Sequence, residues 1–387
     1  MGLQLRWARG PESEFRWFWC DGLNRRYGHF PSAHGRRSHK NVYIGNCKVF
    51  DNRGIPEKKG HSGTGIVISG VDGAVIEYCE AFNNGELNRS TAGGPIGIWA
   101  WESSNVVIQF CESHHNKTGT LDGGGFDLDG GCVNSTLQYN YSHDNYGAGY
   151  GLYQFKGASA FKDNIVRYNI SENDGQIGGY GAIYFRSTRS HGGIQNTRVY
   201  NNTLHVSAKT TGAGIGEISD EPSISHVHNS EIYNNIIVTA PGKHVVDIPR
   251  PAAGWSFKGD CYWTAGEHPE IKWNGIVYSS LSGWRSATGQ ETLKGAPVGF
   301  HMEPRLAKVG GGATIGDPAK LQSMTAYMLL ADSPMIDSGL DLRSLFGIEI
   351  GERDFYGAQV PQLSGYDVGA CESEIAHNRH AENTTKN

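Results

Sequence analysis

The sequence lacks the features of a membrane-spanning or nucleic-acid-binding protein. No apolar run reaches the length that crosses a bilayer, and the first twenty residues contain no apolar core of a signal peptide. Charged residues make up only 19% of the 387 residues and the formal net charge is -5, so no basic surface for a nucleic acid is indicated. We therefore expect neither a membrane span nor a nucleic acid partner.

The seven cysteines form no pattern that predicts a disulfide or a metal site. Their number is odd and no CxxC occurs, which argues against a disulfide framework and against a cysteine zinc site. Glycine, in contrast, is abundant, because its 54 residues are about twice the usual share. Together with 11% aromatic residues, this composition excludes a disordered chain and predicts many short strands joined by tight turns.

One sequence pattern recurs along the middle of the chain. It appears in "NVYIGNCKVFDN" (41–52), "GAVIEYCEAFNN" (73–84) and "NVVIQFCESHHN" (105–116), and in four later segments. An aliphatic residue takes the same place in each copy, at intervals of 29 to 33 residues: Ile44, Ile76, Ile108, Leu137, Val166, Val199 and Ile232. A fixed period of this length indicates a solenoid of stacked repeats.

Three positions after the aliphatic column, the repeats carry a column of cysteine and then asparagine. Its members are Cys47, Cys79, Cys111, Asn140, Asn169, Asn202 and Asn235. Like residues at one position of a stack predict ladders of side chains roughly 4.8 Å apart, in which asparagines bond one another and cysteines act as small buried hydrophobes. These cysteines are therefore interpreted as structural, and a further column, Asn52, Asn84, Asn116 and Asn145, marks another turn.

A second series of short strands precedes the first, as in "GIVISG" (65–70), "GIWAWES" (97–103) and "GFDLDGG" (125–131). The apolar period is two and helix-capping patterns are missing, so the repeats are built from strands. Parallel strands stacked repeat over repeat predict an all-β fold, the parallel β-helix.

The repeat sets the expected domain organisation. We expect a lead-in and first rung over residues 1–40, β-helix rungs over 41–254, and C-terminal rungs with a capping segment over 255–372. This irregular segment should pack on the coil or cap it, because an open sheet edge invites aggregation. The polar residues 373–387 predict a disordered tail.

From about residue 40 onward the chain resembles the right-handed parallel β-helix proteins of the pectate-lyase-like superfamily. The resemblance rests on the Cys/Asn ladders, on "GGGFDLDGGCVNSTLQYNYSHDN" (123–145) and on C-terminal phrases such as "LLADSPMIDSGLDL" (329–342) and "YDVGACE" (366–372). Many members are secreted carbohydrate-active enzymes. The resemblance thus implies a right-handed coil, an extracellular or periplasmic location and a polysaccharide or oligosaccharide substrate.

The pair Asp127 and Asp129 lies in the second strand series, between glycine clusters. Aligning the strands at their leading glycine points Phe126 and Leu128 into the coil and both aspartates outward. Alternation sends aromatic residues of neighbouring rungs to the same face, and the predicted substrate-binding residues are Trp99, Trp101, Tyr153 and Phe155, with Lys156 and Arg186 beside them. This face either binds sugars through its aromatic rings or is covered as a second core.

Three roles are open for the aspartate pair. Two carboxylates with Cα atoms roughly 6.5–7 Å apart can have side chains ~5 to ~9 Å apart, which spans both glycosidase geometries. Their mutual repulsion raises one pKa, giving an acid and a base. The pair could instead help bind Ca²⁺, with Asp122 or Asp144 contributing, or simply solvate the strand.

Histidines supply further catalytic candidates. His61 precedes its strand and could reach the aspartate face, while His143 should stack on His114 one rung below. Because Phe50, Phe82 and Glu172 share that column, a buried or turn-filling role competes with a catalytic one for His143. Glu217 falls on an inward position.

The favoured hypothesis is a monomeric glycoside hydrolase acting on a polysaccharide, with Asp127 and Asp129 sharing the acid and the base or nucleophile roles. An acidic cleft repels a polyuronate unless Ca²⁺ intervenes, which ranks hydrolysis above elimination. The family resemblance favours the first alternative, a uronate lyase or C5-epimerase that uses Ca²⁺. The second alternative is a non-catalytic β-helix that binds glycans. No cofactor is certain beyond this Ca²⁺ option.

Overall fold

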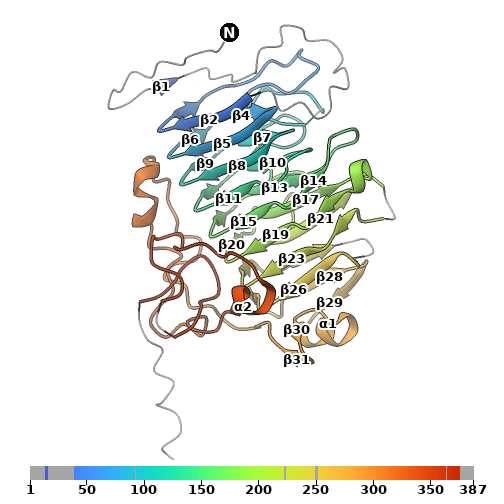
Figure 1. Cartoon of the computed structure of the whole chain (residues 1–387), viewed down its shortest axis with the longest axis vertical. Helices are drawn as coiled ribbons and strands as arrows, with labels where there is room; N and C mark the ends of the chain where they lie inside the picture. Colours follow the sequence, from blue (N-terminus) through green and yellow to red (C-terminus); the bar gives the residue numbers. More distant parts are fainter. Residues whose placement is uncertain are drawn as a thin grey trace, which may run out of the picture.

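The computed structural model describes residues 39–91, 93–221, 224–248, 252–362 and 364–374, together with a short strand at residues 14–15. Most of the predicted lead-in (1–40) and tail (373–387) therefore lies outside the described residues, as does Cys20. The described chain is an all-β coil with a few short helices (Figure 1). None of the helices that the structure describes is long and apolar enough to cross a membrane.

Three long parallel sheets form the sides of the coil. Sheet A consists of β1 (Glu14–Phe15), β3 (Lys48–Phe50), β6 (Glu80–Phe82), β9 (Glu112–His114), β12 (Tyr141–His143), β16 (Ile170–Glu172), β20 (Thr203–Val206), β24 (Ile236–Thr239) and β27 (Cys261–Thr264). Sheet B consists of β2 (His39–Gly45), β5 (Val71–Glu77), β8 (Ser104–Gln109), β11 (Thr136–Gln138), β15 (Ile165–Arg167), β19 (Arg198–Tyr200), β23 (Ser230–Tyr233) and β26 (Trp255–Lys258).

Sheet C carries the aspartate pair. It consists of β4 (Ile66–Ser69), β7 (Ile96–Trp101), β10 (Gly124–Leu128), β13 (Tyr150–Tyr153), β17 (Ile183–Ser187), β21 (Ile215–Ser219), β25 (His244–Ile248), β28 (Glu270–Trp273) and, antiparallel to β28, β29 (Ile276–Tyr278). A small third strand series adds β14 (Phe161–Lys162), β18 (Ile194–Gln195) and β22 (Val227–His228).

Each full turn of the coil passes through sheets C, B and A in that order, as in β7, β8 and β9. The predicted right-handed parallel β-helix is confirmed. Each copy of the sequence repeat supplies two strands, one in sheet B and one in sheet A, which meet at a sharp corner. Phe110 occupies this corner between β8 and β9 with a left-handed backbone (φ 52°), and Tyr139 does so one rung later (φ 57°).

The Asn ladder behind this corner is confirmed. The Asn140 amide donates to Asn169 Oδ1 at 3.1 Å, Asn169 to Asn202 at 3.0 Å, and Asn202 to Asn235 at 2.9 Å. Asn235 in turn donates to Asp260 Oδ1 at 2.8 Å. Every amide therefore donates one hydrogen bond toward the C-terminal end of the coil and a second to a carbonyl of the preceding rung, and the final member of the ladder is a carboxyl that accepts.

The second asparagine column also forms a ladder. Asn84 donates to Asn116 Oδ1 at 3.0 Å, Asn116 to Asn145 at 2.9 Å, and Asn145 to Asp174 at 2.8 Å. This ladder, too, ends on a buried carboxyl. The cysteines Cys47, Cys79 and Cys111 are buried and unpaired, as predicted for structural residues.

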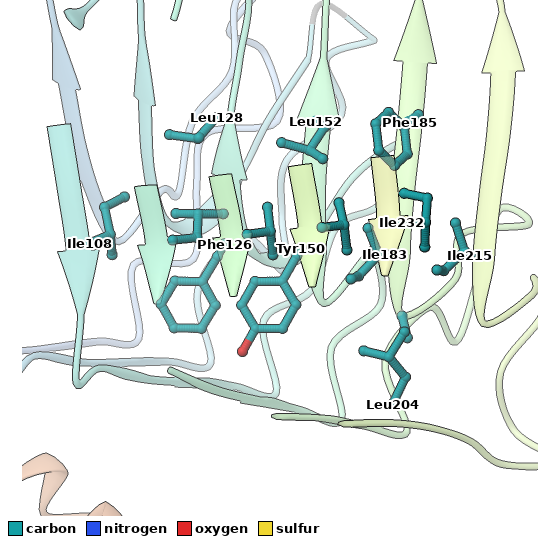
Figure 2. Packing of buried hydrophobic residues seen from close by; sticks show 14 of the residues in the cluster. Ile108, Phe126, Leu128, Tyr150, Leu152, Ile183, Phe185, Leu204, Ile215 and Ile232 are labelled. Carbon is teal, nitrogen blue, oxygen red and sulfur yellow. The ribbon is translucent and has the colours of Figure 1, made fainter. Parts of the chain in front are cut away.

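The interior of the coil is filled by rows of apolar side chains, one from each rung. Phe126 and Tyr150 stack at 5.3 Å between ring centroids, and Leu128 lies beside Leu152 in the next row (Figure 2). Both rows are fully buried. Because the rows repeat along the coil, each rung rests on the apolar face of its neighbours.

The C-terminal segment packs along the coil, as predicted (Figure 1). It contains α1 (Leu281–Thr288), β30 (Thr292–Leu293), β31 (Ala296–Pro297), η2 (Pro318–Ser323) and α2 (Leu342–Phe346); a further 3-10 turn, η1 (Ser190–Gly192), lies in the coil. Residues such as Leu306, Tyr327 and Ile336 share one buried cluster with Tyr141 and Ile170 of sheet A. The C-terminal segment thereby covers the outer face of sheet A, and its amides 315 and 316 reach as far as Glu112 of β9.

Candidate functional site

The outer face of sheet C holds the aspartate pair, and strand pairing sets its neighbours. Asp127 pairs with Trp99 of β7 and with Gly151 of β13. Phe126 and Leu128 are fully buried inside the coil, so Asp127 and Asp129 point away from it, as the alternation predicts. Here the strand pattern determined the orientation correctly.

The predicted alignment of β13 is wrong by two residues. We matched Gly151 with Gly125, but Phe126 pairs with Tyr150 and Asp127 with Gly151. Tyr153 still points outward, because a shift of two keeps the same side, yet it pairs with Arg186 and lies level with Asp129. The residue level with Asp127 is a glycine, which leaves space above the carboxyl.

The aromatic residues of this face are covered rather than open to solvent. Trp99 is 3% exposed, Tyr153 6% and Tyr184 8%. Tyr153 and Tyr184 form a small cluster with Ala148 and Tyr180, which come from the segments that lead into β13 and β17. Of the two alternatives for this face, the covered one describes Trp99 and Tyr153.

Asp127 is buried under this cover without a full set of partners. Asp127 is only 1% exposed, and its Oδ1 has no hydrogen-bond partner among the described residues. The ring of Tyr153 bends back over Gly151, where a β-carbon would lie 2.8 Å from Tyr153 Cζ and 3.1 Å from Asp127 Oδ1. Asp129 is half-buried and accepts a hydrogen bond from the Gly130 amide at 2.7 Å.

Burial and repulsion give the two carboxyls unusual acidities. Burial, followed by the charges of Asp129 and Asp122, raises the pKa of Asp127 well above its usual range. Burial also raises the pKa of Asp129 to about 7, against the Gly130 amide, which favours the charged form. Of the pair, Asp127 is therefore the carboxyl that holds its proton to the higher pH, while Asp129 releases its proton near pH 7.

A third carboxyl and two further polar groups join the pair. Tyr180 donates its hydroxyl to Asp122 Oδ1 at 3.1 Å, and burial raises the pKa of Asp122, against this bond and the charge of Arg186. Arg186 itself forms an ion pair with Asp220 at 3.0 Å. We considered Asp122 only as a metal ligand, and Tyr180 was missed because it lies in an irregular segment between strands.

Three other predicted residues lie around the pair at varying depth. The ring of Phe155 lies over Gly130, and Trp101 packs beside Val67 and Trp99 at half exposure. Lys156 follows in the turn after β13 and is exposed. These residues form the edge of the site, where a bound polymer could reach them.

His61 reaches this face, as expected. Its ring meets Trp99 edge to face at 5.2 Å between centroids. Burial, with a smaller contribution from Lys58, lowers the pKa of His61 to about 4, so the imidazole is neutral near pH 7. It contacts the ring next to Asp127.

The structure places His143 on sheet A, a different side of the coil. Its ring stacks on His114 at 4.7 Å, in a column with Phe82 and Phe50, as the repeat predicted. Burial lowers the pKa of His143, but Asp144 and Glu112 outweigh this effect and raise it to about 9. His143 is thus separated from the aspartate pair. Glu217 is buried in β21, level with Phe185, and accepts from Ser187 and Ser225.

An open hollow continues the outer face of sheet C beyond the pair. It has a volume of about 280 Å³ and its lining includes Tyr184, Thr211, Gly216, Asp247 and Lys272. Tyr184 pairs with Gly151, which pairs with Asp127, so the hollow begins two strands away from the carboxyl. It provides a concave, polar surface in line with the pair.

The carboxyls of sheet C do not converge on one point. Within the described residues, the groups whose ligand atoms all lie within 4.8 Å of one another are Glu112, His114 and His143, and His115, His143 and Asp144. Asp122, Asp127 and Asp129 form no such group. Because Ca²⁺ takes six to eight oxygen ligands at 2.3–2.6 Å, this arrangement does not fit a calcium cage made of the three carboxyls.

Residues 31–204 match the family model described as right handed beta helix region. The resemblance to right-handed parallel β-helix proteins is thereby confirmed for the fold. No curated protein matches the sequence.

Several solved structures are similar to the chain. A glycoside hydrolase is 12% identical, with a TM-score of 0.37, over 60% of this chain and 46% of that one. A Bacillus subtilis pectate lyase mutant is 16% identical, with a TM-score of 0.31, over 73% and 67%. A tailspike protein mutant of an E. coli bacteriophage, in complex with a pentasaccharide, is 13% identical, with a TM-score of 0.35, over 59% and 43%. The chain thus spans less than half of the glycoside hydrolase, and at these identities and TM-scores the similarities carry no argument about activity.

Proposed function

We propose that the protein is a polysaccharide-degrading glycoside hydrolase whose reaction takes place at Asp127 and Asp129. The observation that carries the proposal is the environment of Asp127: a buried carboxyl with an unpartnered oxygen, next to a half-exposed carboxyl of pKa about 7. Perturbed neighbouring carboxyls of this kind are typical of acid and base pairs in active sites.

The different environments of the two carboxyls support a different role for each. Asp127 keeps its proton near neutral pH and donates it to the glycosidic oxygen as the bond to the anomeric carbon breaks. Asp129 is ionised above pH about 7 and either activates a water molecule or attacks the anomeric carbon. Access to Asp127 requires the Tyr153 ring to swing away from Gly151, where it now lies.

The remaining polar and aromatic residues are assigned to substrate binding. The polymer lies across the strands of sheet C, from Trp101 and Phe155 toward the hollow beside Tyr184. Sugar C–H faces pack on the aromatic rings, while Arg186, Lys156 and Lys272 offer charged donors to hydroxyl groups. A polymeric substrate fits an extracellular or periplasmic location.

A calcium-dependent lyase or epimerase is the second candidate. The observation in its favour is Asp122, whose charge acts on both carboxyls of the pair. The separation of the three carboxyls ranks it second, since a cation here would need ligands from the substrate or from water to complete its shell.

A polysaccharide screen with two product assays tests the proposal. We expect new reducing ends without an ultraviolet-absorbing unsaturated product, and no loss of rate with a chelator. The opposite pattern, an unsaturated product lost on chelation, would move the assignment to the lyase.

The variants Asp127→Asn and Asp129→Asn test the site itself. Removing either group should lower kcat roughly 10²–10⁴-fold, the usual contribution of general acid–base catalysis, while affinity for the glycan is kept. Asp163→Asn, an exposed aspartate in the turn between β14 and β15, is the matched control and should keep full activity. Full turnover in both site variants would contradict the assignment, and glycan binding without turnover in the parent protein would support a binding module instead.

A further inference from the structure

A second cluster of chemically capable side chains lies on sheet A, at the ends of β9 and β12. The rings of His114 and His143 stack in parallel, 4.7 Å apart between centroids. His115 stands perpendicular beside both, at 5.1 Å from His114 and 5.5 Å from His143. Three imidazoles and the carboxyl of Asp144 thus meet at one corner of the coil.

A backbone feature brings these neighbours together. Consecutive residues of a strand point to opposite sides, so His114 and His115 would diverge in an extended chain. His115 and Asp144 instead both have a left-handed backbone, each with φ 54°, at equivalent corners after β9 and β12. The corner turns their side chains back toward the stacked rings.

The two buried histidines present the same nitrogen to this corner. His114 Nε2 lies 3.1 Å from Glu80 Oε1, and His143 Nε2 lies 3.3 Å from Glu112 Oε1. A carboxylate at Nε2 can hold a proton there once a metal replaces the proton on Nδ1, which is the arrangement found behind metal-bound histidines. The carboxylates are fixed in turn, Glu80 by Lys48 and Glu112 by the amides of residues 315 and 316.

The ligand atoms have the separations of a metal site. His114 Nδ1 lies 2.9 Å from His115 Nδ1, and His143 Nδ1 lies 3.0 Å from Asp144 Oδ2. The ligand atoms of His115, His143 and Asp144 all lie within 4.8 Å of one another. Around Zn²⁺, with bonds of about 2.0–2.1 Å, the edges of a tetrahedron are roughly 3.3 Å, so modest shifts allow these three side chains to supply three ligands, and water can supply the fourth.

We propose that this corner binds a divalent first-row transition metal, in the first place Zn²⁺, through His115, His143 and Asp144, with water as the fourth ligand. Two imidazoles and one carboxylate suit zinc, whereas Ca²⁺ and Mg²⁺ prefer oxygen ligands. The metal enters from solvent, because His115 is exposed and Asp144 half-buried. It fastens two rungs together beside the place where the C-terminal segment docks on Glu112.

The experiment uses the full chain without an affinity tag, stripped of metal with a chelator and titrated with Zn²⁺ by calorimetry. His115→Ala and Asp144→Asn are the test variants, because both side chains reach the surface and leave the buried stack intact. His228→Ala, an exposed histidine on β22, is the matched control. In both test variants we expect either the loss of one bound equivalent of Zn²⁺ or a rise of at least tenfold in its Kd. The control should bind Zn²⁺ as the parent protein does.

Co²⁺ provides a second readout of the same site. A tetrahedral set of nitrogen and oxygen ligands should give visible absorption in the parent protein and in His228→Ala, and His115→Ala should remove it. No Zn²⁺ binding by the parent protein, or equal binding by all four proteins, would overturn the proposal. Glycan turnover does not enter this test, so its outcome is independent of the function proposed for sheet C.

Discussion

The outer faces of sheets A and C differ in how well their buried charges are matched. On sheet A, Glu112 accepts from the amides of Ile315 and Gly316, both at 2.7 Å, and from His143. Glu172 accepts from Gly312 at 3.0 Å and from Tyr327 at 2.7 Å. Both carboxylates therefore hold the C-terminal segment on the coil.

On sheet C, a buried carboxyl oxygen and a buried ring nitrogen are left without partners within the described part of the chain. Asp127 Oδ1 and Trp99 Nε1 are buried and have no hydrogen-bond partner among the residues that the structure describes. An unmatched buried polar group costs about 1–3 kcal/mol, so such groups persist mainly where function requires them. The carboxylate of Glu112 therefore stabilises the fold, whereas the buried carboxyl of Asp127 costs stability.

Removing a carboxylate from sheet A should have the largest effect on stability. Glu112→Ala leaves two amides and His143 without their acceptor, and we expect the free energy of unfolding to fall by about 3 kcal/mol. Asp127→Asn should cause little loss, because a neutral amide of the same shape replaces a carboxyl whose Oδ1 has no hydrogen-bond partner to lose among the described residues. Urea unfolding of both variants measures the difference, and equal losses would abolish the distinction between the two faces.

The pH dependence of turnover tests the role of Asp129 on sheet C. Since the pKa of Asp129 is about 7, its ionised form decreases tenfold for each pH unit below that value. We expect kcat/KM to fall about tenfold per pH unit from pH 7 to pH 5. The control variant Asp163→Asn should show the same fall. A flat profile over this range would remove Asp129 from the base or nucleophile role.

A buried carboxyl inside the coil gives a smaller effect. Burial, opposed by hydrogen bonds from Ser171 and Asn145, raises the pKa of Asp174 to about 7. The folded state thus keeps a proton that the unfolded chain loses near pH 4, so stability falls as pH rises from about 4 to 7 and then levels off. The loss from Asp174 should be about 1.4 kcal/mol per pH unit.

Asp174→Asn should lower this slope by the share of the one carboxyl, because other buried carboxyls such as Asp129 also hold a proton near pH 7. An amide at this position can donate to Ser171, as Asn145 donates to Ser142 and Asn116 to Ser113, each at 3.1 Å. Urea unfolding at pH 5 and pH 7 compares the two proteins. If the variant kept the slope of the parent, the proton would reside on another group.

Much of the fold follows from the sequence because each rung repeats the same physical requirements. The column from Cys47 to Asn235 predicted a ladder, and its amides do bond one another along the coil. The outward orientation of the Asp127 side chain was equally predictable, since alternation along a strand determines whether a residue points into or out of the coil. Local patterns sufficed for both features.

The cover over the aspartate pair could not be predicted in the same way. Two glycines, Gly149 and Gly151, lie two residues apart, and choosing between them shifts β13 without changing which side chains point outward. The segments that bring Tyr180 and Asp122 over the face have unequal lengths and no repeat to align. Their position depends on tertiary packing that no single rung encodes.

The direction of the Asn ladders limits how this coil could be re-engineered. Each ladder amide donates a hydrogen bond to the next rung. A rung copied from the region around Asn169 can therefore be inserted wherever the following rung offers an acceptor at the ladder position. The rung that carries Asp260 accepts but offers no amide, so it belongs only at the end. A lengthened coil should be made by duplicating middle rungs, with the terminal carboxyl left in place.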